Sequence, residues 1–311
     1  MIAMTRPIRL RDFIEDTDGR LYAVSNYDNT ERVGCVLRYV PDENGERTAP
    51  DGRRYHKLDF EDAFDYIREH KPEYLDTVHR VPHSDIARVL KPDREIIHIA
   101  ARDERVMRLL PVLGVPIDNI GCTGSLLCGL ENSGSDIDMV VYGRDWFAAQ
   151  ANLKKAMETG DIQPLSEEMW EKVYTKRVPE IDYETFLRHE KRKWNRGEIE
   201  GTYFDLLYTR SYERLESASW GKGEVLGRDV IEATVTDASL SFDSPAVYLV
   251  EHEEISRVLS FTHTYSGQAL AGETIEAAGV VEQHGEEKWL IVGTTREAKG
   301  EFIISETLMD S

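Results

Sequence analysis

The chain has 311 residues, of which 41% are hydrophobic, and carries a formal net charge of −20. Two or three domains with packed cores fit this length, whereas so acidic a surface repels nucleic acid at low salt and argues against a general DNA-binding protein. We interpret the excess of Asp and Glu first as adaptation to concentrated salt, where a Debye length of about 3 Å at about 1 M screens the repulsion. An acidic mesophilic protein with a small, uncharged partner is the alternative.

The predicted elements of the first segment, residues 1–82, are mostly strands. Alternating β-branched and aromatic residues predict strands over Arg20–Ser25 and Val33–Val40, and a third strand, RRYHKL, follows a turn rich in Pro, Gly and Asp. Apolar residues at three- and four-residue spacing predict a helix over Phe60–His70. The first segment is therefore expected to be a small β/α region.

The second segment, residues 83–215, mixes helices and strands. A short helix capped by Ser84 is expected over Ser84–Leu90, then a long helix over Arg94–Leu113 that Asp93 begins and Gly114 ends. The elements expected after it are a strand, a short helix, a second strand, three helices and a third strand. They cover Ile117–Cys122, Ser125–Leu130, Asp136–Tyr142, Trp146–Glu158, Ser166–Lys176, Tyr183–Trp194 and Thr202–Thr209.

The last segment, residues 221–311, is rich in Thr, Val, Ser and Gly. Short strands at regular spacing with Gly turns predict a small β-barrel that is similar to an oligonucleotide-binding (OB) fold in strand count and length. Such a likeness of fold says little about function, and packing or dimerisation is the alternative role. The six expected strands are Val230–Asp237, Ala246–Val250, Arg257–Phe261, Thr274–Glu282, Lys288–Thr294 and Phe302–Ser305.

The cysteines and the apolar runs bear on location. Cys35, Cys122 and Cys128 have no regular spacing, and so small and odd a number indicates a reducing compartment. The N-terminus lacks an apolar core of signal-peptide length, and no run approaches the ~20 apolar residues of a membrane span. We therefore expect a soluble, cytoplasmic protein without a membrane partner.

Three carboxylates and one turn have a pattern suited to metal-assisted phosphoryl chemistry. Asp136 and Asp138 alternate along a predicted strand, so both point to one face. Asp205 lies within the apolar run TYFDLLYT, where a carboxylate needs a partner. Gly124 permits a close backbone approach where a strand turns into a helix, and Ser125 offers a hydroxyl to a phosphate. Mg²⁺ prefers such hard oxygen ligands together with substrate phosphates.

In their order and spacing these residues resemble the DNA polymerase β nucleotidyltransferase superfamily, which has a Gly-Ser turn, an Asp-x-Asp pair about ten residues later and a third Asp on a later strand. The resemblance covers roughly residues 84–212 and implies a mixed α/β (α+β) sheet with helices. The segment RDFIE…LRYVP…RRYHKL is also similar to archaeal predicted nucleotidyltransferases of this superfamily. The interval between Asp138 and Asp205 is longer than expected for a minimal member.

The resemblance also implies roles. Asp136 and Asp138 would ligate the metal that holds a nucleoside triphosphate and would share the second, catalytic metal. Asp205 would ligate only the catalytic metal, and Gly124 with Ser125 would bind the β- and γ-phosphates. The implied reaction moves a nucleotidyl group to a hydroxyl with Mg²⁺ or Mn²⁺ and releases pyrophosphate. Among acceptors we favour RNA over DNA or a small molecule, because flanking modules suit a large acceptor.

Other interpretations stay open. Asp136 and Asp138 could be a strand-start cap and a solvent-facing acid, and Asp205 could be a buried acid paired with an arginine. In the basic run from Lys191 to Arg196, Lys191 and Lys193 are candidates for phosphate binding, with a solvated helix end as the alternative. A catalytically silent nucleotide- or nucleic-acid-binding protein and a small-molecule nucleotidyltransferase are the alternative functions.

Overall fold

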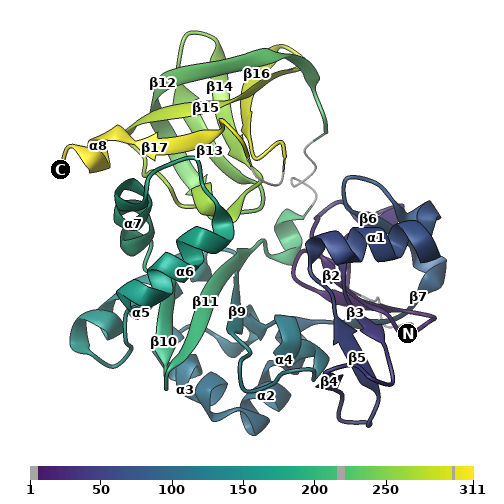
Figure 1. Ribbon diagram of the computed structural model, residues 1–311. Helices are drawn as coiled ribbons and strands as arrows, with labels where there is room; N and C mark the ends of the chain where they lie inside the picture. Colours follow the sequence, from purple (N-terminus) through teal and green to yellow (C-terminus); the bar gives the residue numbers. More distant parts are fainter. Residues whose placement is uncertain (1–5, 216–220, 296–297) are drawn as a thin grey trace. The chain divides into compact units, whose positions relative to one another are not determined.

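The computed structural model describes residues 6–215, 221–295 and 298–311 and has a mixed α/β architecture of the α+β kind, with three sheets and helices beside them (Figure 1). The chain forms two compact units, each built from two stretches of sequence. The first contains Met1–Gln163 and Gly197–Ser219, and the second contains Pro164–Arg196 and Trp220–Ser311. These units differ from the three consecutive segments expected above, because residues 1–82 share a unit with most of residues 83–215.

A seven-stranded antiparallel sheet begins the first unit. Helix α1 (Phe60–His70) packs on strand β3 (Arg32–Pro41), and Asp59 caps it by accepting a hydrogen bond from the backbone N–H of Asp62. The expected helix and the three expected strands of this region are confirmed. The other strands are β1 (Phe13–Asp16), β2 (Leu21–Val24), β4 (Arg47–Thr48), β5 (Arg54–Lys57), β6 (His79–Pro82) and β7 (Ile86–Leu90).

The helix expected over Ser84–Leu90 is wrong. A 3-10 turn covers His83–Asp85, and Ile86–Leu90 forms β7, which pairs antiparallel with β1 so that Val89 lies opposite Ile14. The hydrogen bonds of this pairing come from a strand more than seventy residues away along the chain. Local spacing does not contain that information, so a non-local partner overrides the local preference.

The single helix expected over Arg94–Leu113 is two helices, α2 (Pro92–Arg102) and α3 (Glu104–Leu113). Asp103 lies between them with an extended backbone and caps α3 by accepting hydrogen bonds from the N–H groups of Arg105 and Val106. Lys91, not Asp93, is the N-cap of α2. A side chain that caps a helix start competes with continued helix, which explains the break. The expected end at Gly114 is confirmed, with φ 63°.

The second sheet of the first unit has four strands in the order β10-β11-β9-β8. Strand β9 (Ile137–Tyr142) lies between β8 (Ile120–Cys122), which is antiparallel to it, and β11 (Thr202–Thr209), which is parallel to it. Buried Trp146 of α5 (Asp145–Thr159) packs against the sheet and donates Nε1–H to the carbonyl of Leu206 at 3.4 Å. The remaining elements are α4 (Gly124–Cys128) and β10 (Arg196–Ile199).

A buried charge network joins these two sheets within the first unit. The guanidinium of Arg9 lies 3.6 Å from the ring centre of Tyr142 and 3.9 Å from that of Tyr212, and pairs with Asp93 at 3.1 Å. Next to it, Nζ of Lys91 lies 2.6 Å from a carboxylate oxygen of Asp12. Breaking buried pairs of this kind leaves an uncompensated charge, so the network holds residues 9–12 in one position.

The second unit contains a six-stranded sheet in which β12 pairs with both β13 and β15, so that the sheet closes on itself. Strands β14 and β16 are parallel, and the other pairs are antiparallel. The six expected strands and the two expected helices of this unit are confirmed. Their bounds are α6 (Glu167–Arg177), α7 (Tyr183–Arg192), β12 (Glu224–Leu240), β13 (Ala246–Glu251), β14 (Ile255–Ser260), β15 (Thr274–His284), β16 (Glu287–Val292), β17 (Phe302–Ser305) and, not expected, α8 (Glu306–Met309).

Two further observations complete the fold. The three cysteines are free thiols, and burial raises the pKa of each one. None of the helices in the described residues is both long enough and apolar enough to span a bilayer.

Candidate functional site

The carboxylates of Asp136, Asp138 and Asp205 belong to one face of the four-stranded sheet. Asp205 of β11 lies directly opposite Asp138 of the parallel strand β9. Neighbouring residues in register point to the same side of a sheet, and so do residues two apart on one strand. Asp136, which immediately precedes β9, is exposed, whereas Asp138 and Asp205 are half-buried. The arrangement concentrates three negative charges at one place.

The Gly-Ser turn lies against these carboxylates. Gly124 has a left-handed backbone with φ 68°, and a Cβ atom at this position would clash with Oδ2 of Asp138. The preceding residue, Thr123, holds the turn: its N–H donates to the carbonyl of Asp138 at 2.9 Å and its hydroxyl donates to the carbonyl of Arg11 at 2.7 Å. Only glycine combines this backbone conformation with so close an approach.

The charge concentration changes the acidity of Asp138. Burial raises the pKa of its carboxyl to about 6, with the neighbouring charges of Asp205 and Asp136 acting in the same direction and those of Arg11 and Lys57 opposing them. On the neighbouring strand β11, the Tyr203 hydroxyl donates a hydrogen bond to Oδ2 of Asp205 at 2.8 Å. A carboxyl with a pKa near 6 is costly to ionise unless a cation neutralises it.

A cavity of about 220 Å³ opens at this site. It is lined by Gly124, Ser125, Asp136 and Asp138. Asp205 is not among the described residues that line it. Four basic side chains of the lining were missed by the sequence reasoning, namely Arg11, Arg38, Arg47 and Lys57. Arg38 and Lys57 lie on two predicted strands, and basic residues on strands of so acidic a chain were a usable signal.

The donor chemistry of this site fits a hard divalent cation. Among the described residues, no group of three or more His, Cys, Asp or Glu side chains is close enough to hold a metal ion by itself. Mg²⁺ commonly uses one or two carboxylates and completes its octahedron with water and substrate phosphates. Asp138 with one neighbouring carboxylate fits that pattern of partial protein ligation. A dication would offset the cost of ionising Asp138, whose pKa is raised first by burial and then by the charges of Asp205 and Asp136.

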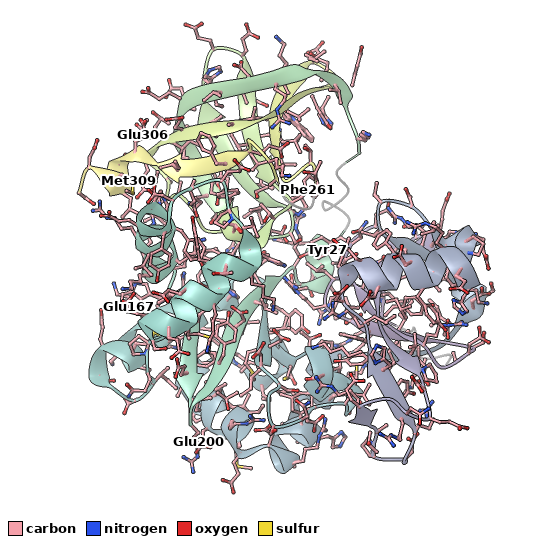
Figure 2. The ribbon with its side chains drawn as sticks, viewed as in Figure 1. Tyr27, Glu167, Glu200, Phe261, Glu306 and Met309 are labelled. Atoms are coloured by element: carbon pink, nitrogen blue, oxygen red, sulfur yellow. The ribbon has the colours of Figure 1, made fainter. Side chains whose placement is uncertain are left out.

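The two lysines predicted to bind phosphate lie in the second unit and form ion pairs there. Lys193 is buried, and its Nζ contacts a carboxylate oxygen of Glu190 and the carbonyl of Thr264, the latter at 2.9 Å. Lys191 is more exposed and lies 2.7 Å from Glu167, the α6 residue labelled in Figure 2. These contacts give Lys193 a structural role, because a buried ammonium must keep its partners.

We expect Gly124→Ala to lower the free energy of unfolding by about 1–2 kcal/mol, because an L-residue is strained at positive φ, and to weaken Mg²⁺ binding, because the new methyl group displaces Asp138. Chemical denaturation and magnesium titration measure the two effects. Gly160→Ala is the matched control, since Gly160 has φ 83° with no atom within 4 Å of the added Cβ. Unchanged Mg²⁺ binding in Gly124→Ala would contradict the role of the turn.

The comparisons with known proteins identify a relative of the whole chain. The chain is 38% identical over 334 residues to a protein of Methanocaldococcus jannaschii described as "Uncharacterized protein MJ1086", with 95% of this chain and 98% of that protein covered. The chain belongs to the same family as this protein. No family model matches the chain, and no solved structure gives a significant match.

Proposed function

We propose that the chain is a metal-dependent nucleotidyltransferase of the DNA polymerase β type. The observation that supports this proposal best is the register of Asp205 with Asp138 across two parallel strands, beside a glycine turn that approaches Asp138. A solvent-facing pair of acids would need neither the third carboxylate nor the close turn. The raised pKa of Asp138 supports the same function, because a bound dication would stabilise the ionised form.

In this proposal the carboxylates hold and orient the reacting groups. A bound Mg²⁺ or Mn²⁺ pair would supply Lewis acidity at the phosphate and lower the pKa of the acceptor hydroxyl. Asp136 and Asp138 hold the triphosphate end of the site, Asp205 holds the acceptor end, and Gly124 with Ser125 contacts the outer phosphates. The acceptor oxygen forms a bond to the α-phosphorus as the bond from that phosphorus to the oxygen bridging to the β-phosphate breaks. Pyrophosphate leaves, and the proton of the acceptor hydroxyl passes to water.

We further propose that the closed sheet of the second unit is an OB-like domain that helps to bind an RNA acceptor. Five strands, β12 to β16, make its ring, which is the number in an oligonucleotide-binding barrel. A chain with a net charge of −20 repels RNA at low salt, so we expect the interaction to need salt high enough to screen that repulsion.

The test is incubation of the protein with labelled nucleoside triphosphates and Mg²⁺ or Mn²⁺ at high salt, with total RNA, with cell metabolites or with no acceptor. We expect label to enter RNA and pyrophosphate to be released. Asp136→Ala combined with Asp138→Ala should abolish both products, while the matched double variant of exposed acids, Asp118→Ala with Glu253→Ala, should retain them.

Three outcomes would change the conclusion. Label in metabolites but not in RNA would make the enzyme a small-molecule nucleotidyltransferase. Tight nucleotide binding without any turnover would make the chain a catalytically silent nucleotide-binding protein. Transfer that persists in the Asp136→Ala, Asp138→Ala variant would place the activity elsewhere or in a contaminant, and so would contradict the proposed site.

A further inference from the structure

The reaction proposed above assigns no contact with the substrate to four basic side chains of the cavity. Arg11, Arg38, Arg47 and Lys57 all come from the first 57 residues, before or within the N-terminal sheet, whereas the carboxylates come from the four-stranded sheet. Both sheets belong to the same compact unit. Four cations around one cavity are a strong local reversal of charge in a chain with a net charge of −20.

Two of these arginines are fixed to the catalytic side of the cavity. Arg47 donates from Nη1 to the carbonyl of Leu130 and to the hydroxyl of Ser135, both at 3.2 Å, so it contacts the loop that leads into Asp136. Arg11 has a left-handed backbone with φ 75°, and its carbonyl accepts the hydrogen bond from Thr123 described above. Strained non-glycine residues persist where the surroundings impose them, often at binding sites.

The other two cations extend the positive wall along the sheet. Arg38 is half-buried on β3, and its guanidinium has no hydrogen bond or ion pair with any residue that the structure describes. Lys57 is exposed at the end of β5, and its charge helps to lower the pKa of Asp138. Carboxylate neutralisation therefore accounts for Lys57 in part but does not account for Arg38. An arginine that faces a polar cavity without a partner suits a multivalent oxyanion, because its fork of donors matches phosphate.

We propose that Arg38, Arg47 and Lys57, together with Arg11, form a binding site for the polyphosphate chain of the substrate. At about 220 Å³ the cavity is smaller than the roughly 300 Å³ at which pockets begin to enclose a drug-sized ligand, so it fits the phosphates better than a whole nucleotide. The inference rests on the proposed function for the identity of the nucleotide. Capture of the anion by these side chains does not itself require a metal.

The test is calorimetric titration of the full chain with inorganic tripolyphosphate in EDTA, at a salt concentration at which circular dichroism shows every variant folded. We expect the wild type to bind tripolyphosphate more tightly than orthophosphate or sulfate, and to lose affinity as salt rises. Arg38→Gln and Lys57→Gln should each weaken binding about 10-fold, as expected for the loss of one charge-assisted contact. Arg94→Gln, the same change at an exposed arginine outside the cavity, should stay within about twofold.

The result is independent of catalysis. No tripolyphosphate binding in EDTA, or an Arg38→Gln variant that binds as well as Arg94→Gln, would overturn the inference. Arg38→Lys keeps the charge and should bind with intermediate affinity, so it tests the site if Arg38→Gln does not fold. If transfer is absent while tripolyphosphate binding depends on Arg38, the proposed function fails and the anion site stands. If transfer occurs while Arg38→Gln binds normally, the reverse holds.

Discussion

Replacement of Asp205 by asparagine should reduce nucleotidyl transfer by at least about 1000-fold while nucleotide affinity changes by less than about threefold. The third carboxylate would serve only the catalytic metal, whose charge stabilisation is worth several kcal/mol in the transition state. Asp205 is also absent from the described lining of the cavity that is proposed to hold the phosphates, so replacing Asp205 should change the affinity for the triphosphate little. Rapid-quench measurement of a single turnover, with separate titration of a nonhydrolysable triphosphate, gives the two numbers.

The substitution Asp205→Asn tests the charge of the carboxylate alone, because the fold should tolerate it. The asparagine side chain has nearly the same shape as the aspartate, and its amide oxygen can still accept the hydrogen bond that Tyr203 donates. Tyr203→Phe is the matched control, since it removes that hydrogen bond but keeps the carboxylate, and we expect it to retain activity within about 10-fold. If Asp205→Asn turns over within about 10-fold of the wild type, Asp205 is a structural acid and the proposed function loses its third ligand.

Asp138→Asn should make the protein more stable above pH 6 by about 1–3 kcal/mol, although it removes a proposed metal ligand. The pKa of this carboxyl is about 6 in the folded chain and near its ordinary value of 3.8 when unfolded. The folded state therefore binds the extra proton between about pH 4 and pH 6, so the stability of the wild type falls as the pH rises through that window. Below about pH 4 the Asp138 carboxyl of the wild type is protonated and uncharged, as the asparagine of the variant is at every pH. The two proteins should therefore be equally stable there.

Denaturant unfolding at a series of pH values in EDTA measures this effect. Asp118→Asn removes an exposed carboxylate of the same unit and should change stability by less than about 0.5 kcal/mol at every pH. Mg²⁺ added at pH 8 should stabilise the wild type but not Asp138→Asn, because binding to the folded state alone raises stability. Equal stability of the two proteins at pH 8 in EDTA would mean that the charge of Asp138 is already compensated within the chain.

Both experiments depend on the free-energy cost of ionised carboxylates on apolar strands, which the sequence pattern predicts. Carboxylates at the start of one apolar strand and in the middle of another are unfavourable without a cation, and the raised pKa of Asp138 expresses that cost directly. The protein retains a destabilising group at the place where the proposed chemistry needs it. We interpret this conflict between stability and charge as a second observation, beside the register of Asp205 with Asp138, that supports the proposed dication.

The sequence by itself determined the elements whose signals are local. The short, largely apolar runs DIDMVVY and TYFDLLYT predict two strands, and their bounds are Ile137–Tyr142 and Thr202–Thr209. The period of two in a strand then puts Asp136 and Asp138 on one face, since alternate side chains of a strand point the same way. The end of α3 at Gly114 was equally accessible, because the left-handed cap is a property of a single residue.

Only the tertiary structure decided which distant segments meet. No local pattern states that Asp205 lies opposite Asp138, since strand register depends on the packing of both faces. The same limit applies to Ile86–Leu90, which is a strand because β1 pairs with it, and to Lys193, which is buried against Glu190 rather than exposed at a helix end. The basic wall of the cavity also required the fold, because its arginines lie about a hundred residues before the carboxylates that they face. Periodicity along the chain predicts to which face of an element a side chain points. Which distant elements pair with one another is decided by how they pack together.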